Sequence, residues 1–325
     1  MSIILPEGLT MRPPTIDDLE IVHKLSLAHD LALYGEEDTS LEDLREHWTA
    51  LKHDLARDQR LVFDQAGQLI ANLYMERRHV KFFVHVLVRP DYGDPRVSDH
   101  LLELGETWAR EQMVQAESGV RLTLNGWANS TDQDSLQHYV RAGFTENRRY
   151  WDMEIKMHEA PPLPVWPEGV ELRSFVPERD ARAAFEMMEA AFNDHWGHLP
   201  GDFDEWRHHK IERADFDASL WFIAYEGEQI AGGALCSDGS QSWVDTLGIL
   251  RPWRRKGLGL VLLHHAFGEF YRRGKHTVVL GVDSQNLTGA TRLYQRAGMH
   301  IKRENISFEK ELRAGVELST QVLTV

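Results

Sequence analysis

A short pattern of residues occurs twice in the chain, and this repeat constrains the fold more than any other feature. His138–Phe144 reads His-Tyr-Val-Arg-Ala-Gly-Phe, and Leu293–Met299 reads Leu-Tyr-Gln-Arg-Ala-Gly-Met. The openings Leu9–Arg12 and Val170–Arg173 also correspond, so the copies lie about 155–160 residues apart. A chain of 325 residues suits two domains of ordinary size better than one core. Two related domains are therefore expected.

A proline-rich segment separates the two copies. Residues 158–167 contain four prolines, which can neither continue a helix nor occupy a central strand. We therefore expect domains at 1–157 and 168–325, joined by a linker at 158–167.

Composition narrows the classes of function. The formal charge of −15 repels nucleic acid on average, so a phosphate-bearing ligand needs a local basic site. No apolar run approaches the about 18 residues of a membrane span, and the N-terminus lacks the pattern of an export signal. The single cysteine, Cys236, excludes an intramolecular disulfide and fits a reducing compartment. We expect a cytoplasmic protein with neither a membrane nor a nucleic-acid partner.

In the second copy, periodicity and turn residues predict a strand, two helices, three strands, a helix, a strand, a helix and a strand. After the opening strand, helices are expected at 178–192 and 202–214, strands at 220–225, 229–236 and 242–250, a helix that ends at Gly274, a strand at 277–282, a helix at 289–297 and a strand at 300–310. This order predicts an α/β (mixed α+β) fold in each copy, with a mixed, mostly antiparallel sheet flanked by helices.

The segment Leu247–Leu260 carries the strongest functional signal, because it joins the end of a strand to the start of a helix. Gly257 and Gly259 allow a tight turn and a close approach of the backbone to a ligand. The unpaired N–H groups at the helix start form an anion site. Four cations between Arg251 and Lys256 add to it, so the segment predicts a diphosphate ligand.

Two well-known phosphate loops do not match this segment. The Walker pattern needs Lys-Ser or Lys-Thr after its second glycine, and neither follows here. The dinucleotide fingerprint needs a third glycine, but Leu262 stands at that position.

The remaining pattern, Arg-x-x-Gly-x-Gly after an apolar strand end, resembles the pyrophosphate loop of GNAT-superfamily N-acetyltransferases. Asn286, Ala290, Leu293-Tyr294 and Gly298-Met299 continue the resemblance, which covers about residues 170–312. The tandem arrangement is similar to that of mycothiol synthase in architecture, so the substrate of that enzyme is not carried over. The resemblance implies two tandem GNAT folds with acetyl-CoA as co-substrate.

The resemblance also implies roles for individual residues. Backbone groups of Leu247, Gly248 and Ile249 would pair with the pantetheine arm as an added strand does. The pyrophosphate would contact Arg254, Arg255, Lys256, Gly257, Leu258, Gly259 and Leu260, with Asn286 as a further cofactor contact. Tyr294 would be the general acid. The structural alternatives are that Asn286 caps the next helix and that Tyr294 is a core residue.

The implied reaction is acetyl transfer to a primary amine of a small molecule, or of a peptide, by direct attack in a ternary complex. Asp245 is our candidate base, because it lies two residues before Leu247 and strict alternation places both on one face. The alternative is a solvated or salt-bridged strand residue. Cys236 lacks an identifiable histidine partner and is not expected to carry the acyl group. The competing function is a non-catalytic acyl-CoA-binding sensor.

The segment 192–206 is aromatic and acidic, and in the family this region borders the acceptor pocket. We expect Asp194, Asp202 or Glu205 to pair with a cationic amine. The alternative is a solvated loop anchored by its tryptophans. Seventeen histidines match no metal-site spacing, so no metal is expected.

The corresponding loop of the first copy has lost its anion-binding features. Arg96 and Ser98 replace the two glycines, Pro95 removes an N–H donor, and Asp91 and Asp94 add negative charge. We therefore expect a degenerate domain that is structural or shapes the acceptor site. It would stand in for the second subunit of a family dimer, which predicts a monomer with an internal pseudo-dimer, or a homodimer.

Overall fold

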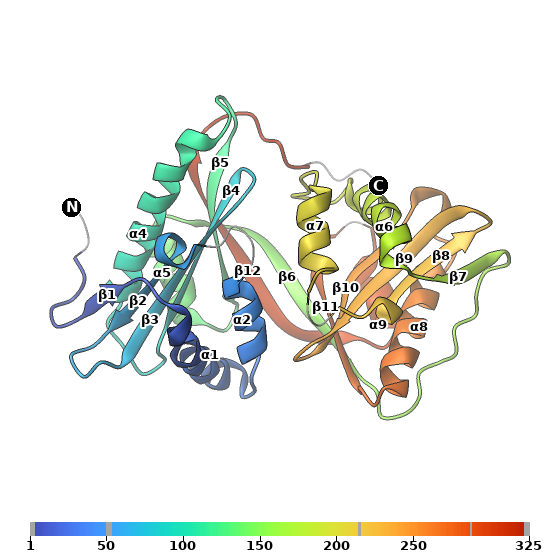
Figure 1. The fold of residues 1–325 in the computed structure, drawn as a ribbon, viewed down its shortest axis with the longest axis horizontal. Helices are drawn as coiled ribbons and strands as arrows, with labels where there is room; N and C mark the ends of the chain where they lie inside the picture. Colours follow the sequence, from blue (N-terminus) through green and yellow to red (C-terminus); the bar gives the residue numbers. More distant parts are fainter. Residues whose placement is uncertain (1–3, 50–53, 214–215, 287, 322–325) are drawn as a thin grey trace. The chain divides into compact units, whose positions relative to one another are not determined.

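The computed structural model describes residues 4–49, 54–213, 216–286 and 288–321. Two compact units divide the chain. The first unit comprises residues 1–149 and 305–318, and the second unit comprises residues 150–304 and 319–325. Each unit has its own hydrophobic core, and Figure 1 shows the elements of each.

The first unit is a mixed sheet with helices. Its elements are β1 (Thr10–Arg12), α1 (Leu19–Tyr34), α2 (Leu41–Thr49), α3 (Leu55–Asp58), β2 (Gln59–Phe63), β3 (Leu69–Arg78), β4 (Lys81–Val88), α4 (Arg96–Gln112), β5 (Leu122–Asn129) and α5 (Gln133–Arg141). Strands β1 to β5 lie side by side in chain order, and the pair β4–β5 is parallel whereas the other pairs are antiparallel.

The second unit repeats this plan. Its elements are β7 (Val170–Ser174), α6 (Pro177–Phe192), α7 (Phe203–Lys210), β8 (Trp221–Glu226), β9 (Gln229–Asp238), β10 (Ser242–Ile249), α8 (Leu258–Arg272), β11 (Thr277–Asp283) and α9 (Ala290–Arg296). The pair β10–β11 is parallel, and the other pairs are antiparallel. The predicted mixed, mostly antiparallel sheet flanked by helices is confirmed. The helix expected at 202–214 ends at Lys210, and residue 214 lies outside the described residues.

Each unit is completed by the last strand of the other sequence copy. In β6 (Thr145–Lys156), Tyr150–Lys156 pairs antiparallel with β11, and Met153 enters the core of the second unit. In β12 (His300–Arg313), Asn305–Arg313 pairs antiparallel with β5 in the first unit. The units therefore differ from the contiguous domains expected from the linker, because the proline run at 158–167 says nothing about which sheet a flanking strand joins.

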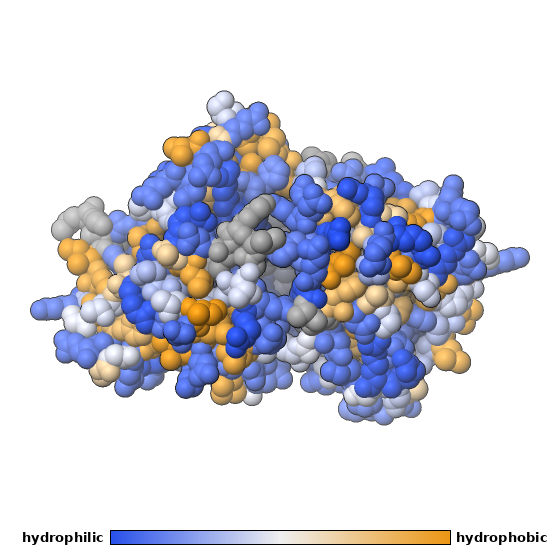
Figure 2. Space-filling model, viewed as in Figure 1, coloured by the Kyte–Doolittle hydropathy of each residue, from blue (hydrophilic) through white to orange (hydrophobic). Residues whose placement is uncertain are grey.

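Helices cover both faces of the sheet in the second unit. Phe222 and Ala224 of β8 point into the core that α8 covers, whereas Trp221 and Ile223 point to α6 and α7. This alternation is that of a strand buried on both faces. The surface is largely hydrophilic on the face shown in Figure 2, where hydrophobic side chains lie in scattered groups. None of the helices in the described residues is long and apolar enough to cross a membrane.

Candidate active site

The loop after β10 has the backbone of an anion-binding turn. A 3-10 turn at Arg251–Trp253 follows the strand, and α8 begins at Leu258. Arg255 and Gly257 have φ values of 63° and 84°. A positive φ is unusual for arginine and marks a constrained backbone of the kind found at functional sites. Gly257 also has a positive φ, at which a residue with a side chain would be strained, and this explains why glycine occupies the position.

Two of the loop's cations hold the loop itself. The guanidinium of Arg254 donates to the carbonyl of Ile249 at 3.0 Å and to that of Ala191 at 3.1 Å. Arg251 pairs with Asp194 at 2.5 Å, and Arg254 lies 3.5 Å from the same carboxylate. The hydrogen bond from Arg251 is the main reason why the pKa of Asp194 is lowered. These contacts fix the loop to the end of α6, so contact between Arg254 and a pyrophosphate stays a prediction.

The other two cations are available to a ligand. Arg255 and Lys256 are exposed, and no carboxylate of the described residues pairs with either. They precede the first turn of α8, whose leading N–H groups lack intrahelical acceptors. Two free cations beside a helix start suit a diphosphate, which carries charge on several oxygens.

Strands β10 and β11 separate beside this loop, and we call the gap between them the parting. Their described register contains only Ser242–Val278 and Trp243–Val279, although β10 continues to Ile249. On its other edge, β10 stays paired with β9 through Leu247, Gly248 and Ile249. The edge of β10 that faces the parting therefore offers backbone donors and acceptors to a ligand that lies along it.

Two glycines of these strands differ in how closely their neighbours pack against them. A Cβ added at Gly281 of β11 would meet nothing within 4 Å, whereas one at Gly248 would meet the Cβ of Ala191 at 2.9 Å. Gly248 is thus required for the packing of α6, a role the sequence did not indicate.

Tyr294 of α9 is 8% exposed, and burial raises its pKa to about 12. Its hydroxyl is therefore protonated at neutral pH.

Asp245 lies on the α7 side of β10. Its Oδ1 is 3.4 Å from the Nζ of Lys210, and its side chain is 24% exposed. A β-bulge between Val244 and Thr246 interrupts the alternation of the strand. Leu247 packs into the core beneath α8. The expectation that Asp245 and Leu247 share one face is therefore wrong, because it assumed a strand without a bulge.

In the acidic segment between α6 and α7, Asp194 and Asp202 are engaged in contacts within the protein. Asp194 pairs with the loop arginines, and Asp202 accepts a hydrogen bond from the N–H of Glu205 at the start of α7. Trp206 is buried in the core beneath α6, which fits the alternative of an anchored loop. A direct role of Asp194 or Asp202 in pairing with an amine would require these contacts to break.

Two further expected positions have local structural roles. Asn286 accepts hydrogen bonds from the N–H of Thr288 at 2.7 Å and from its hydroxyl at 2.5 Å. Helix α9 begins after Gly289, whose φ is 82°, so Asn286 closes a turn and is not the helix cap that one interpretation expected. Cys236 is buried, and burial raises the pKa of its thiol. In the described ranges, no group of three or more His, Cys, Asp or Glu residues could hold a metal ion.

The corresponding loop of the first unit is closed by its own ion pairs. Asp94 pairs with Arg96 at 2.5 Å, and Asp91 pairs with Arg89 at 2.5 Å. Ser98 donates to the carbonyl of Pro95 at 2.9 Å. The charges that would meet a phosphate are thus paired locally.

Comparison with known proteins supports the assignment of the fold. The acetyltransferase (GNAT) family model matches residues 182–299. A mycothiol acetyltransferase from Thermobispora bispora is 30% identical, and the match covers 55% of this chain and 62% of that protein. One from Stackebrandtia nassauensis is 26% identical, with 78% and 82% covered.

Solved structures extend this similarity to nearly the whole chain. A GCN5-related N-acetyltransferase from Sphaerobacter thermophilus has a TM-score of 0.86 and 32% identity, with 98% of this chain and 100% of that chain covered. A tandem GNAT protein from the clavulanic acid biosynthesis pathway has a TM-score of 0.73 at 14% identity, with 95% and 100% covered, and shares the fold. The chain therefore belongs to the acetyltransferase (GNAT) family, as a tandem member with two copies of the fold.

Proposed function

We propose that the second unit transfers an acetyl group from acetyl-CoA to a primary amine of a small molecule, by direct attack in a ternary complex. The observation that carries this proposal is the parting of β10 from β11 beside the exposed cations Arg255 and Lys256, which pair with no carboxylate of the described residues. In the corresponding loop of the first unit, Arg89 and Arg96 are instead paired with Asp91 and Asp94. Family membership supports the use of an acyl-CoA.

The coenzyme would be held by complementary parts of the loop and strand. Arg255 and Lys256 would neutralise the pyrophosphate, whose oxygens would also accept from the first N–H groups of α8. The amide-bearing pantetheine arm would pair with the free edge of β10 at Leu247–Ile249. This binding mode directs the thioester into the parting, where Gly281 leaves open space.

The transfer itself needs one base, one acid and a donor for the oxyanion. The neutral amine attacks the thioester carbonyl, the new C–N bond forms and the C–S bond breaks. A base removes the extra proton of the amine, and Tyr294 donates a proton to the departing thiolate. Burial suits Tyr294 to this role, because its hydroxyl keeps its proton at neutral pH. A backbone N–H of β10 would stabilise the oxyanion.

Asp245 remains our candidate base, on grounds that differ from strand alternation. Its carboxylate is partly exposed on the side of α7, next to the segment that borders the acceptor pocket in the family. The amine would then approach from the α6–α7 side while the coenzyme enters at the loop.

The acceptor is proposed to be a small molecule, since several relatives are mycothiol acetyltransferases by name. Release of CoA thiol from acetyl-CoA should be measured with a panel of primary amines that differ in charge. Turnover with at least one amine is expected. Calorimetric binding of CoA without turnover of any amine would favour an acyl-CoA-binding sensor, and absence of CoA binding would overturn both functions.

A further inference from the structure

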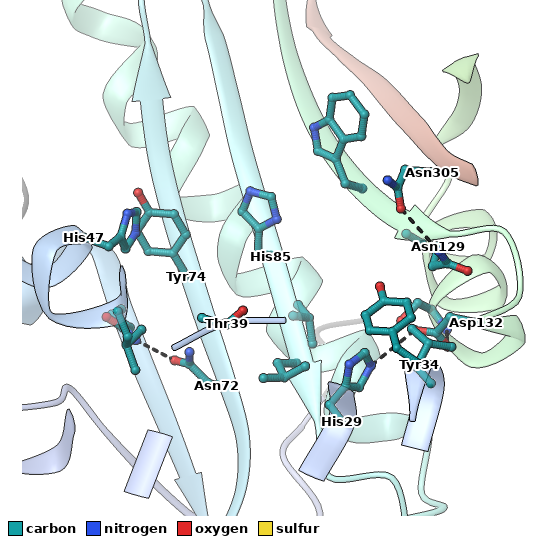
Figure 3. Close-up of a pocket in the computed structure, with 18 of the residues that line it drawn as sticks. His29, Tyr34, Thr39, His47, Asn72, Tyr74, His85, Asn129, Asp132 and Asn305 are labelled. Carbon is teal, nitrogen blue, oxygen red and sulfur yellow. Dashed lines mark hydrogen bonds and ion pairs between the residues drawn. The ribbon is translucent and has the colours of Figure 1, made fainter. Parts of the chain in front are cut away.

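The first unit contains a cavity that the transfer reaction does not use. Its volume is about 410 Å³, within the range of small-molecule sites. Its walls come from α1, α2 and strands β2 to β5, with Asn305 contributed by β12. Figure 3 shows polar side chains from these elements around one space.

The charge of the lining excludes several ligand classes. The described residues that line the cavity include no lysine or arginine, and Asp132 is the one carboxylate among them. A phosphate or carboxylate ligand would therefore lack a permanent cationic partner. Asp132 is itself engaged, because it lies 3.4 Å from His29 and accepts from the N–H of Ser135 at 3.1 Å.

The pKa values of the lining fit a neutral guest. Burial opposes ionisation of Asp132, but hydrogen bonds from His29 and Ser135 outweigh it and bring the pKa to about 2. Burial lowers the pKa of His85 to about 4 and raises that of Tyr74. At neutral pH His85 and Tyr74 are therefore uncharged hydrogen-bonding groups, and the carboxylate of Asp132 is already in contact with His29 and Ser135.

The cavity lining combines hydrogen-bonding groups with aromatic rings. His47 contacts Tyr74 edge to face at 4.4 Å between centroids, and Tyr74 stacks with His85 at 5.8 Å. In Figure 3, these rings lie on one side of the space, and His29, Tyr34, Asn129 and Asp132 lie on the other. A ligand here meets apolar ring surface and polar atoms in several directions.

The amide side chains of Gln59 and Asn72 add donors and acceptors for which the described residues do not supply every partner. Gln59 donates to the Oδ1 of Asn72 at 2.8 Å, and no acceptor for the Asn72 amide hydrogens is found among the described residues. Gln59 is 1% exposed, and its Oε1 has no partner in the part of the chain that the structure describes. An unsatisfied buried amide calls for an explanation, and bound water or a ligand supplies one.

We propose that this cavity binds a small, neutral, polyhydroxylated ring compound, that is, a sugar of one or two rings. Its C–H faces would pack on aromatic walls such as Trp127 and Tyr74, and its hydroxyls would bond to the amides and to the imidazole of His85. A planar heterocycle fits less well, because the rings of His47, Tyr74 and His85 do not form two parallel walls around a slot. The proposal does not depend on the acetyl transfer proposed for the second unit.

The test uses the full chain and equilibrium binding. Glucose, galactose and trehalose are titrated by calorimetry and by intrinsic tryptophan fluorescence, with glucosamine, glucose 6-phosphate and adenosine as charged or planar comparators. At least one neutral sugar should bind saturably. Tyr74→Phe keeps the ring and removes one hydroxyl, so it should weaken binding by about three- to tenfold. Trp127→Ala should weaken it further.

Controls separate ligand contact from damage to the fold. Tyr92→Phe makes the same chemical change in the first unit outside the cavity lining and should leave sugar affinity unchanged. Thermal unfolding of each variant shows whether the fold is intact. Saturable binding of a comparator alone, binding that neither Tyr74→Phe nor Trp127→Ala alters, or no saturable binding of the three sugars would overturn the proposal.

Discussion

The equivalent tyrosines of the two copies, Tyr139 and Tyr294, have different surroundings. Tyr139 and Tyr294 follow Gly126 and Gly281 at the same spacing. In the first unit, β4 and β5 also pair only at their start, but the hydroxyl of Tyr139 donates to the carbonyl of Val84 at 3.1 Å. Its ring lies against Gly126, where an added Cβ would clash with it. In the second unit, the space at Gly281 is open.

This difference separates a structural tyrosine from a candidate catalytic one. Tyr139 stacks on Phe308 at 5.1 Å and its hydroxyl donates to Val84, the first residue of β4 beyond the pairing with β5, so this hydroxyl is engaged within the fold. Together with the ion-paired loop at Asp94 and Arg96, this engaged tyrosine explains why the first unit should not bind a coenzyme as the second does. Pairs of matched substitutions can test the contrast.

The largest contrast is expected from removing each tyrosine hydroxyl. Tyr294→Phe should lower kcat by about a hundredfold or more, because a general acid contributes on that order. Tyr139→Phe should leave kcat unchanged and reduce the free energy of unfolding by about 1–3 kcal/mol, since the carbonyl of Val84 loses a buried donor. Steady-state kinetics and urea unfolding measure the two effects. Equal kcat in Tyr294→Phe and the unmodified protein would remove Tyr294 from the mechanism.

The next effect concerns the base. Asp245→Asn should lower kcat by about a hundredfold while CoA binding persists, because the amide cannot accept the amine proton. Asp204→Asn, in the first turn of α7, is the matched control and should have no such effect. If kcat with Asp245→Asn stays close to that of the unmodified protein across the pH range, the base must be another group or a water molecule.

The cationic loop should control affinity more than turnover. Replacing Arg255 and Lys256 together by alanine should weaken CoA binding by about ten- to a hundredfold, because two charge-assisted contacts to the pyrophosphate are lost. The effect should shrink at high salt, since both side chains are exposed. Arg89→Ala with Arg96→Ala in the first unit is the matched control. Calorimetry that finds equal losses in both pairs would contradict the assignment of one coenzyme site.

Periodic and motif-bearing parts of the chain were predictable. The helix pattern after Gly257 and the paired glycines indicated the loop, and α8 indeed begins at Leu258. The tandem repeat likewise predicted two similar folds. These features depend on local sequence, where period and turn chemistry act directly.

Features that depend on distant contacts were not predictable. The sequence gives no sign that Asp194 pairs with Arg251, 57 positions away, and an acidic loop residue next to aromatics was interpreted as an amine contact. The bulge beside Asp245 changes the face of the sheet to which neighbouring side chains of the strand point. No glycine or proline marks it in the sequence. The pairing of β6 with β11 depends on tertiary packing, so the linker prolines could not indicate it.

The smallest expected effects come from adding one methyl group at each equivalent glycine. Gly126→Ala should reduce the free energy of unfolding by about 1–3 kcal/mol, because the ring of Tyr139 occupies the space and is held at its hydroxyl. Gly281→Ala meets no neighbour within 4 Å, so folding should be nearly unaffected. If the acyl arm passes through that space, the same change should raise KM for acetyl-CoA by a few-fold, and a KM that stays constant would place the arm elsewhere.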